Sequence, residues 1–322
     1  MLTVNNFIKE FNLNVDLAVE ASDLLRGGKN IEIDGIEEKV ETSKRLRVNT
    51  ITVTTPEAGA RIGKPPGNYI TIQAPPLHVN DPELQEEIIN MLSKTLQKIT
   101  LPFLKPNDPV LLVGLGNRYA AADSLGPKFI EYSPITRHYH RYAPEALIQG
   151  MRPASGIAPG VLGTTGLETL EIIKGVAEQT KPALVIAVDA LAAQQIERIG
   201  SSIQISDTGI QPGAGIGNAR HPLNQRTLGV PVIAIGCPTI VSAAVISNQS
   251  IQKFCSNSAC AYDEAAATES IKKVLSYFGG SLSVTPKEID EIIKNTAKIL
   301  AGGVAAALFP GIKQRQLELY AM

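Results

Sequence analysis

The fold is decided by the stretch Ala183-Leu184-Val185-Ile186-Ala187-Val188-Asp189, in which six consecutive apolar residues lead into a carboxylate. Two further short apolar runs occupy positions 110–113 and 230–235. Strands that are covered on both faces have this continuous pattern, whereas strands with one face in water alternate apolar and polar residues. We therefore predict three central strands of a mostly parallel sheet.

Helices between and after these strands are predicted from the residues that begin them. The Asp-Pro pair at 81–82 suits the N-cap and first position of a long amphipathic helix. Thr165 with Glu168 has the spacing of a capping box, so a helix should open there and end before position 182. Thr285 with Glu288 has the same spacing and predicts a last helix that ends near position 302. Alternating strands and helices predict a three-layer α/β/α core with right-handed crossovers.

The N-terminal part has a different pattern. Residues 29–77 alternate β-branched and polar side chains around the turn Gly63-Lys64-Pro65-Pro66-Gly67, which predicts a small antiparallel sheet. The first sixteen residues have no clear helix cap and are interpreted as a tail. We expect a single α/β domain over residues 17–322, with a β-rich portion at 17–80 and the α/β core at 81–322.

Composition restricts the partners and the compartment. The chain has 322 residues, with 30 Lys and Arg against 31 Asp and Glu and a formal net charge of -1, so no long-range field would recruit nucleic acid or anionic lipid. Its three cysteines form no CxxC pair, which argues against a disulfide framework and fits a reducing cytoplasm. No signal peptide is recognisable, and the uncharged stretch 229–252 is predicted to be a strand, a turn and a helix rather than a membrane span.

Two carboxylates follow the central strands. Asp123 lies in the loop after the first strand, and Asp189 lies at the predicted end of the second. The carboxyl ends of parallel strands share one edge of a sheet, where ligands bind. Two carboxyl groups there can share one proton, so that the ionised group activates a water for hydrolysis. From spacing alone, the alternative that each Asp only caps a following helix stays open.

Other motifs indicate less. Gly114-Leu115-Gly116 lacks the third glycine of a dinucleotide fingerprint, and no phosphate loop, HExxH helix or GxSxG elbow occurs. His138 and His140 lie in a segment that is typical of a solvated loop rather than a metal site. Asp207-Thr208-Gly209 matches the short motif of pepsin-like aspartic proteases but occurs once, and a glycine-rich turn is the simpler interpretation. We expect no metal and no other cofactor.

Several segments, spread over nearly the whole chain, together form a specific signature. They are Val15-Asp16-Leu17-Ala18-Val19-Glu20, Gly63-Lys64-Pro65-Pro66-Gly67-Asn68-Tyr69, Gly114-Leu115-Gly116-Asn117, Asp123-Ser124-Leu125-Gly126-Pro127, Asp189-Ala190-Leu191-Ala192-Ala193, and residues 159–168 and 207–218. In these segments the sequence resembles the germination protease family, the spore endopeptidases of Gram-positive spore formers.

The resemblance implies both an activity and a fold. The fold would be phosphorylase/hydrolase-like and related to the hydrogenase-maturation peptidases. The activity would be that of an atypical aspartic endopeptidase that degrades the small acid-soluble proteins coating spore DNA at germination. Its two catalytic carboxylates fall on Asp123 and Asp189, the pair that topology selected. It also implies a homotetramer in the cytoplasm of the forespore or spore core that binds neither nucleic acid directly nor membrane.

Four residues are expected to support the site. They are Gly114, Gly116, Asn117 and Asp207. Asn117 and the backbone amides of residues 114–117 are candidates to stabilise the oxyanion that forms when water attacks a peptide carbonyl.

The same resemblance implies an inactive precursor that is activated by a cut between Asp16 and Leu17. The acid, the apolar residue, the small residue and Glu20 resemble the site that is cut in the family's substrates, which gives self-processing a chemical rationale. Residues 1–16 would then be a propeptide. An ordinary surface helix over residues 17–25 is the alternative.

The chain also departs from the family pattern. Ala121 and Ala122 stand where Thr-Pro is usual, Ala214 stands where Ser is common, and Phe309 stands where a His is usual. These changes leave both acids intact and bear on the loop geometry and the substrate contacts. Two other functions stay open: a metal-dependent peptidase of the hydrogenase-maturation type, and a non-enzymatic binder of peptide or phosphate whose aspartates are only helix caps.

Overall fold

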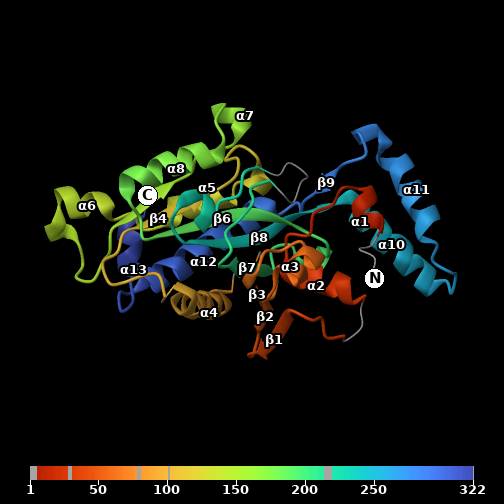
Figure 1. The fold of residues 1–322 in the computed structure, drawn as a ribbon, viewed down its shortest axis with the longest axis horizontal. Coiled ribbons are helices and arrows are strands. Elements are labelled where there is room, and N and C mark those ends of the chain that lie inside the picture. The colour runs from red at the N-terminus through yellow and green to blue at the C-terminus, as the bar shows by residue number, and fades with distance from the viewer. Residues whose placement is uncertain (1–5, 28–30, 78–80, 101, 214–219, 322) are drawn as a thin grey trace.

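One sheet runs through the molecule, with helices on both of its faces (Figure 1). The structure is a computed structural model that describes residues 6–27, 31–77, 81–100, 102–213 and 220–321. Ala214, one of the departures from the family pattern, lies outside the described residues, as does part of the segment 207–218.

The described residues form nine strands in the order β1-β2-β3-β7-β8-β6-β4-β5, with β9 paired to β8. The strands are β1 (Ile36–Thr42), β2 (Arg47–Val53), β3 (Gly67–Gln73), β4 (Val110–Gly114), β5 (Ala154–Ile157), β6 (Leu184–Ala193), β7 (Ser202–Ser206), β8 (Val232–Ser242) and β9 (Ser283–Val284). The pairs among β5, β4, β6 and β8 are parallel, and those among β1, β2, β3 and β7 are antiparallel. The predicted antiparallel elaboration is confirmed, and it is continuous with the parallel part because β7 pairs with both β3 and β8.

Helices occupy the two outer layers. They are α1 (Asn6–Glu10), α2 (Ala18–Arg26), α3 (Pro56–Ile62), α4 (Pro82–Thr100), α5 (Leu125–Tyr132), α6 (Arg137–Tyr142), α7 (Leu162–Thr165), α8 (Thr169–Thr180), α9 (Gln225–Leu228), α10 (Ala243–Asn257), α11 (Glu264–Leu275), α12 (Ile289–Leu308) and α13 (Gln314–Leu317), with the 3-10 turns η1 (Ala121–Asp123), η2 (Pro144–Ala146), η3 (Ile196–Arg198), η5 (Ser276–Phe278) and η6 (Glu318–Tyr320). Among the described helices, none combines the length and the apolar character that a bilayer crossing requires.

The two faces of the central strands pack against different helices. On β4, Val110 and Leu112 join the core beneath α4, α5 and α12, whereas Leu111 and Val113 join the core beneath α8. The residues of β6 divide between the same two cores. Because successive side chains of a strand point to opposite faces, burial on both faces explains the continuous apolar runs. The predicted three-layer α/β/α fold is confirmed, and the strands β5, β4, β6 and β8 of its core are parallel as expected.

Two predicted strand ends are wrong. β6 continues through Asp189 to Ala193, and β8 continues well past position 235. The two strands stay paired along this extension, with a bulge between Leu191 and Ala192. Asp189 is therefore inside a strand. Asp189 interrupts the apolar run, but the residues after it, Ala190-Leu191-Ala192-Ala193, are apolar again and continue the strand.

The predicted helix start at Thr165 is also wrong. Thr165 ends α7, where its hydroxyl donates to the carbonyl of Val161, and the next residue is a glycine in the left-handed region. The following helix, α8, begins at Thr169, and the Glu171 carboxylate accepts the backbone N–H of Glu168. The capping box thus exists three residues later. The segment expected as a loop around His138 and His140 is also helical, as α6.

The last helix differs from the prediction at both ends. Thr285 does not cap it, because the Thr285 hydroxyl donates to the carbonyl of Thr239 on β8, and α12 begins at Ile289. The helix then continues through 302 to Leu308. Gly303 is not a helix stop: a Cβ there would lie 2.5 Å from Leu92 Cδ2, so glycine permits the close approach of α4 and α12.

Candidate active site

Asp123 is held by the loop that follows β4. The chain turns at Gly116 with a φ of +107°, a conformation that favours glycine. A Cβ at this position would lie 2.1 Å from the Asp123 carbonyl oxygen, and one at Gly114 would lie 2.1 Å from the carbonyl oxygen of Gly126. The backbone N–H of Asn117 donates to Asp123 Oδ2 over 2.8 Å. The loop 114–117 thus fixes the position of the Asp123 carboxylate.

Neither aspartate is a helix cap. Asp123 accepts from Asn117 rather than from the first turn of α5, whose N-cap position is Ser124. Asp189 lies within β6, and its Oδ1 accepts the N–H of Ala190 at 2.9 Å. The alternative that these two acids serve only as caps is therefore wrong.

Burial raises the pKa of both carboxyl groups. Asp189 is only 7% exposed, and desolvation raises its pKa well above the ordinary value, with a further rise from the negative charge of Asp123. Burial also raises the pKa of Asp123, although the hydrogen bond from Asn117 lowers it. Two acids that repel one another ionise one at a time. Asp189 is therefore the member of the pair that holds a proton more readily.

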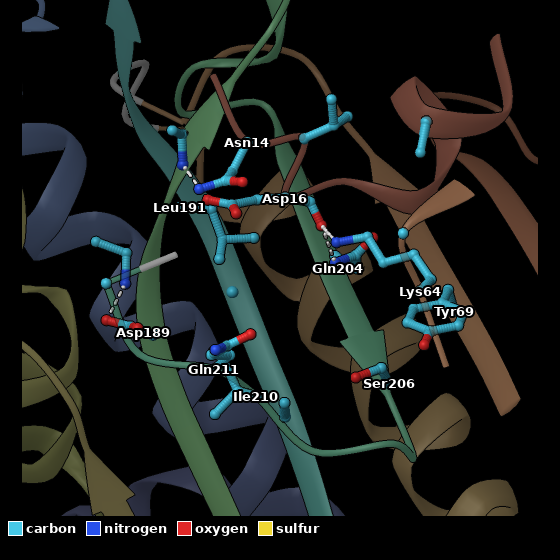
Figure 2. A pocket seen from close by; sticks show the side chains of 18 of the residues that line it. Asn14, Asp16, Lys64, Tyr69, Asp189, Leu191, Gln204, Ser206, Ile210 and Gln211 are labelled. Atoms are coloured by element: carbon cyan, nitrogen blue, oxygen red, sulfur yellow. Dashed lines mark hydrogen bonds between the residues drawn. The ribbon is translucent and has the colours of Figure 1, made fainter. Parts of the chain in front are cut away.

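Asp123 and Asp189 line one cavity of about 840 Å³, and Figure 2 shows Asp189 among the residues around it. Strands β3, β6, β7 and β8, the turn at 63–65 and residues 13–16 of the N-terminal segment contribute to its walls. The size is within the usual range of ligand pockets. The two aspartates predicted from the strand pattern are thus brought together with a part of the chain that precedes the predicted cut.

The peptide bond between Asp16 and Leu17 lies at this cavity. Leu17 is fully buried, and the Asp16 carboxylate accepts the backbone N–H of Ala192 at 2.8 Å. The Asp16 carbonyl accepts bonds from Lys64 Nζ at 2.8 Å and from Gln204 Nε2 at 3.0 Å. Burial raises the pKa of Asp16, and the charge of Asp16 in turn raises that of Asp189. In the described part of the chain, both catalytic candidates take their hydrogen bonds from nearby backbone amides rather than from this peptide bond.

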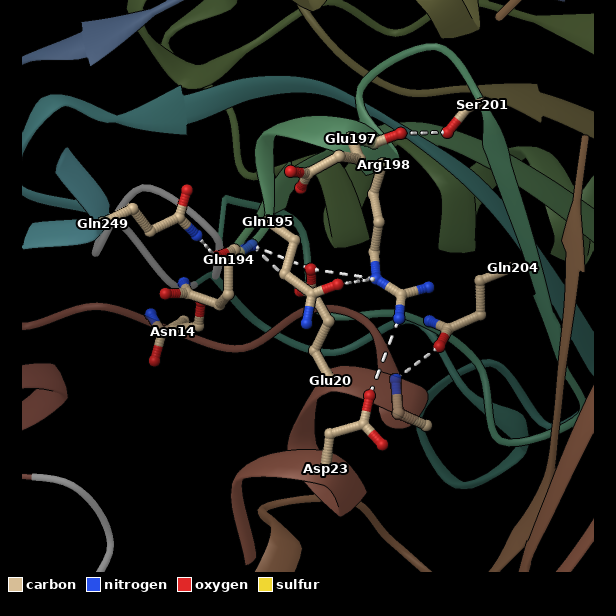
Figure 3. A network of polar contacts seen from close by, with 11 residues as sticks. Asn14, Glu20, Asp23, Gln194, Gln195, Glu197, Arg198, Ser201, Gln204 and Gln249 are labelled. Atoms are coloured by element: carbon tan, nitrogen blue, oxygen red, sulfur yellow. Dashed lines mark hydrogen bonds and ion pairs between the residues drawn. The ribbon is translucent and has the colours of Figure 1, made fainter. Parts of the chain in front are cut away.

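Glu20, four residues after this bond, is the centre of a buried polar network (Figure 3). Its carboxylate accepts the N–H of Gln194 at 3.0 Å and lies 3.4 Å from Arg198 Nε. Burial raises the pKa of Glu20 to about 7, opposed by these two partners. Arg198 also reaches Asp23 at 3.6 Å. The start of α2 is therefore tied to the segment that follows β6.

Asp207 has a different position from the two candidate aspartates. Its carboxylate accepts the backbone N–H of Asn68 at 2.8 Å and the side-chain amide of Asn68 at 2.7 Å. This joins the end of β7 to the beginning of β3. Asp207 therefore braces the wall of the cavity that carries Gln204, and its neighbours Thr208 and Gly209 line the cavity.

Among the residues that the structure describes, no three His, Cys, Asp or Glu side chains gather closely enough to hold a metal ion. His138 and His140 stand on α6 and do not line the cavity. Besides the two aspartates, the described residues that line the cavity include Asp16, the cations Arg61 and Lys64, and several amide side chains, among them Gln204.

Comparison with known proteins identifies one family whose model covers both the described fold and the candidate site. The family model described as "Germination protease" matches residues 15–257 and 258–321. The chain belongs to the germination protease family. A germination protease of Clostridium tetani is 40% identical over 324 residues, covering 96% of this chain and 99% of the relative. One from Bacillus subtilis is 36% identical over 361 residues, covering 97% of this chain and 98% of the relative.

A solved structure is also similar. It is a [NiFe] hydrogenase maturation protease from Thermococcus kodakarensis, with 18% identity and a TM-score of 0.34, covering 66% of this chain and 98% of that one. The sequence relatives make this chain a member of a protease family, and proteases are hydrolases.

The residues that depart from the germination protease pattern have distinct places. Ala122 lines the cavity, and the Ala121 carbonyl accepts the hydroxyl of Ser124. Phe309 is buried in the main core at the end of α12. Phe309, at the position where the resemblance led us to expect a His, therefore belongs to the packing beneath the sheet and does not line the cavity.

Two backbone donors of the loop 114–117 are already bonded within the protein, and the oxyanion role of the others stays a prediction. The N–H of Leu115 donates to the Val188 carbonyl, and the N–H of Asn117 donates to Asp123. The Asn117 side-chain oxygen accepts the N–H of Tyr119. These groups are already engaged in holding the loop.

Sequence reasoning assigned no role to Lys64, Gln204 or Arg198, although each contacts the segment around the predicted cut. Lys64 lies within the segment Gly63–Tyr69, which carries part of the germination protease resemblance, and this was the only sequence feature that pointed to it. Gln204 and Arg198 stand in no recognisable motif, and only the fold brings them to the Asp16–Glu20 segment.

Proposed function

We propose that this germination protease is an aspartic-type endopeptidase in which Asp123 and Asp189 jointly activate water. Asp123 in its ionised form removes a proton from the water, and Asp189 in its protonated form donates to the peptide nitrogen that leaves. The assignment is supported by the greater rise in the pKa of Asp189, which burial causes and the charge of Asp123 reinforces.

The observation that carries this proposal is the shared cavity. The two carboxyl groups line it together with Asp16, whose peptide bond to Leu17 is the one expected to be cut. A carboxylate pair that lines the same cavity as a peptide segment has the groups that general acid and base catalysis of hydrolysis requires. The protein would be made as a precursor with residues 1–16 as a propeptide and residues 17–322 as the peptidase domain.

Small acid-soluble spore proteins are the proposed substrates. The proposal is supported by the family resemblance and by the way residues 16–20 are held. The Asp16 carboxylate accepts the N–H of Ala192, Leu17 is buried, and the Glu20 carboxylate accepts the N–H of Gln194. Release of residues 1–16 would vacate the place of Asp16, which an acidic residue of a substrate could then take. We place the protein in the cytoplasm of the forespore or spore core, with no cofactor and with no direct binding of nucleic acid or membrane.

A homotetramer is proposed for the assembly. Exposed apolar side chains at Phe254, Val274, Tyr277 and Phe278 on the adjoining elements α10, α11 and η5 are suited to contacts between copies. Light scattering of the purified chain after size-exclusion chromatography measures the number of subunits directly.

Cleavage of a purified small acid-soluble spore protein tests the function. The full chain should cut it into fragments that end in an acidic residue, as mass spectrometry of the fragments would reveal. Asp123→Asn and Asp189→Asn should each stop the reaction, whereas Asp290→Asn, at an exposed position of α12, should not. An intact substrate after incubation with the self-processed protein would indicate a binder rather than a protease.

A further inference from the structure

Two side chains from distant parts of the chain converge on one backbone oxygen. Lys64 Nζ and Gln204 Nε2 both donate to the Asp16 carbonyl, over 2.8 and 3.0 Å, and Figure 2 shows the two side chains meeting there. Most buried backbone carbonyls are bonded by other backbone groups. A carbonyl held by a cation and an amide is thus a specific arrangement, and this one belongs to the peptide bond expected to be cut.

Gln204 contacts the backbone on both sides of Leu17. While its Nε2 donates to the Asp16 carbonyl, its Oε1 accepts the N–H of Ala18 at 2.6 Å. These contacts involve main-chain atoms only. Gln204 can therefore hold any peptide that takes this path through the cavity, whatever its side chains.

Lys64 is fixed by the turn that carries it. Its backbone N–H donates to the Gly59 carbonyl at 3.0 Å, and the Tyr69 hydroxyl donates to the carbonyl of Pro65 at 2.7 Å. A Cβ at Gly59 would lie 2.5 Å from the Lys64 carbonyl oxygen, so the helix α3 and the turn approach closely. Burial lowers the pKa of Lys64, and the charges of Asp16 and Glu20 oppose that change. An ammonium group is costly to bury, and here it is aimed at a carbonyl.

We propose that Lys64 and Gln204 are the oxyanion site of this protease, two catalytic residues in addition to the aspartate pair. The proposal rests on the proposed function. The water oxygen bonds to the Asp16 carbonyl carbon while an ionised carboxylate takes one of its protons, and the carbonyl electron pair moves onto the oxygen that Lys64 and Gln204 hold. The carbonyl then re-forms, the bond to the Leu17 nitrogen breaks, and that nitrogen takes its proton from the protonated carboxyl group.

The donors favour this step because negative charge develops on the oxygen they already contact. Donors that are fixed before the reaction stabilise the transition state more than the ground state. Removal of one such donor lowers the rate about 100- to 1000-fold in other hydrolases. The same loss is expected here for each of the two residues.

The test is the rate at which the purified full chain loses residues 1–16, followed by intact mass. Lys64→Met removes the cation and keeps much of the side-chain volume. Gln204→Glu removes the donor and keeps the oxygen that accepts from Ala18. Each should slow the cut about 100-fold or more, and Lys64→Arg should restore part of the rate. Lys44→Met, at an exposed position between β1 and β2, is the matched control and should cut at the wild-type rate.

The outcomes separate this inference from the function on which it rests. If Asp189→Asn stops the cut but Lys64→Met and Gln204→Glu leave it unchanged, the oxyanion site is wrong and the aspartate mechanism stands. A faster cut in folded Lys64→Met would mean that these donors restrain the bond instead of activating it, which also overturns the inference. If the wild-type chain never releases residues 1–16, the proposed self-processing is wrong, and the inference that rests on it is wrong as well. Circular dichroism and thermal melting establish that each variant is folded, and Gln204→Glu decides the matter if Lys64→Met does not fold.

Discussion

Replacement of Glu20 by Gln should remove a large part of the pH dependence of this protein's stability. Glu20 is 1% exposed, and its pKa in the folded protein is raised from 4.5 to about 7, chiefly by burial. In the unfolded chain the group would lose its proton near its ordinary pKa. The folded state therefore binds more protons than the unfolded state between these two values, and the free energy of unfolding must fall as pH rises through that interval.

The magnitude follows from the interval. The difference between 4.5 and about 7 corresponds to about 3 kcal/mol, at about 1.4 kcal/mol for each pH unit. This contribution is fully present below pH 4.5 and is lost by the time the pH has passed about 7. Asp16, Asp123 and Asp189 have raised pKa values as well and add changes of the same sign. The quantity to compare is thus the difference between wild type and variant at each pH.

Urea unfolding between pH 4.5 and pH 8.5 measures that difference, using Asp189→Asn as the background so that the chain is not cut during the experiment. In Glu20→Gln the free energy of unfolding should fall by about 3 kcal/mol less over this range than in the background protein. Glu178→Gln, at an exposed position of α8, should leave the pH dependence unchanged. Identical pH profiles for Glu20→Gln and the background would refute the reasoning from burial.

Three other predictions concern the site. Gly116→Ala should lower the free energy of unfolding by at least about 2 kcal/mol and should slow cleavage. The reason is that φ at Gly116 is +107° and the added Cβ would meet the Asp123 carbonyl. Thermal unfolding measures the first effect, and the rate of self-cutting measures the second. Arg198→Met should slow self-cutting more at pH 8 than at pH 6, since Arg198 is the partner of Glu20 in its ionised form, and equal effects at both pH values would contradict this. Added EDTA should leave the rate of self-cutting unchanged, whereas a loss that zinc or another divalent ion restores would favour the metal-dependent alternative.

The central strands could be predicted because burial on both faces leaves a direct trace in the sequence. Runs such as the one ending before Asp189 contain no polar residue for solvent to contact. The continuation of β6 beyond Asp189 could not be predicted in the same way. A carboxylate after an apolar run has the sequence pattern of a strand end, and only the pairing with β8, which passes a bulge after Leu191, shows that the strand goes on.

The helix starts show how local signals compete. Thr165 has the spacing of a capping box with Glu168, but its hydroxyl bonds backward to Val161, and Glu171 provides the contact to the Glu168 N–H. Both arrangements satisfy backbone groups at a helix end. The choice between them depends on the glycine turn that follows α7.

Some residues of the candidate site could be predicted from the order of the strands, whereas others are brought there only by tertiary contacts. Asp123 follows β4 and Asp189 lies within the neighbouring parallel strand β6, and this arrangement brings both to one cavity. Lys64 and Gln204 reach the Asp16 carbonyl across 48 and 188 positions of sequence. No local spacing encodes such contacts, because they depend on β7 joining the antiparallel strands to the parallel ones.

The most direct test of the central claim is the intact mass of the purified wild type, Asp123→Asn and Asp189→Asn after the same incubation. The wild type should lose residues 1–16 and begin at Leu17, and each folded variant should keep its full mass. A folded variant of either aspartate that still releases the same N-terminal segment at the wild-type rate would contradict the claim that these two carboxyl groups together direct water at the peptide bond.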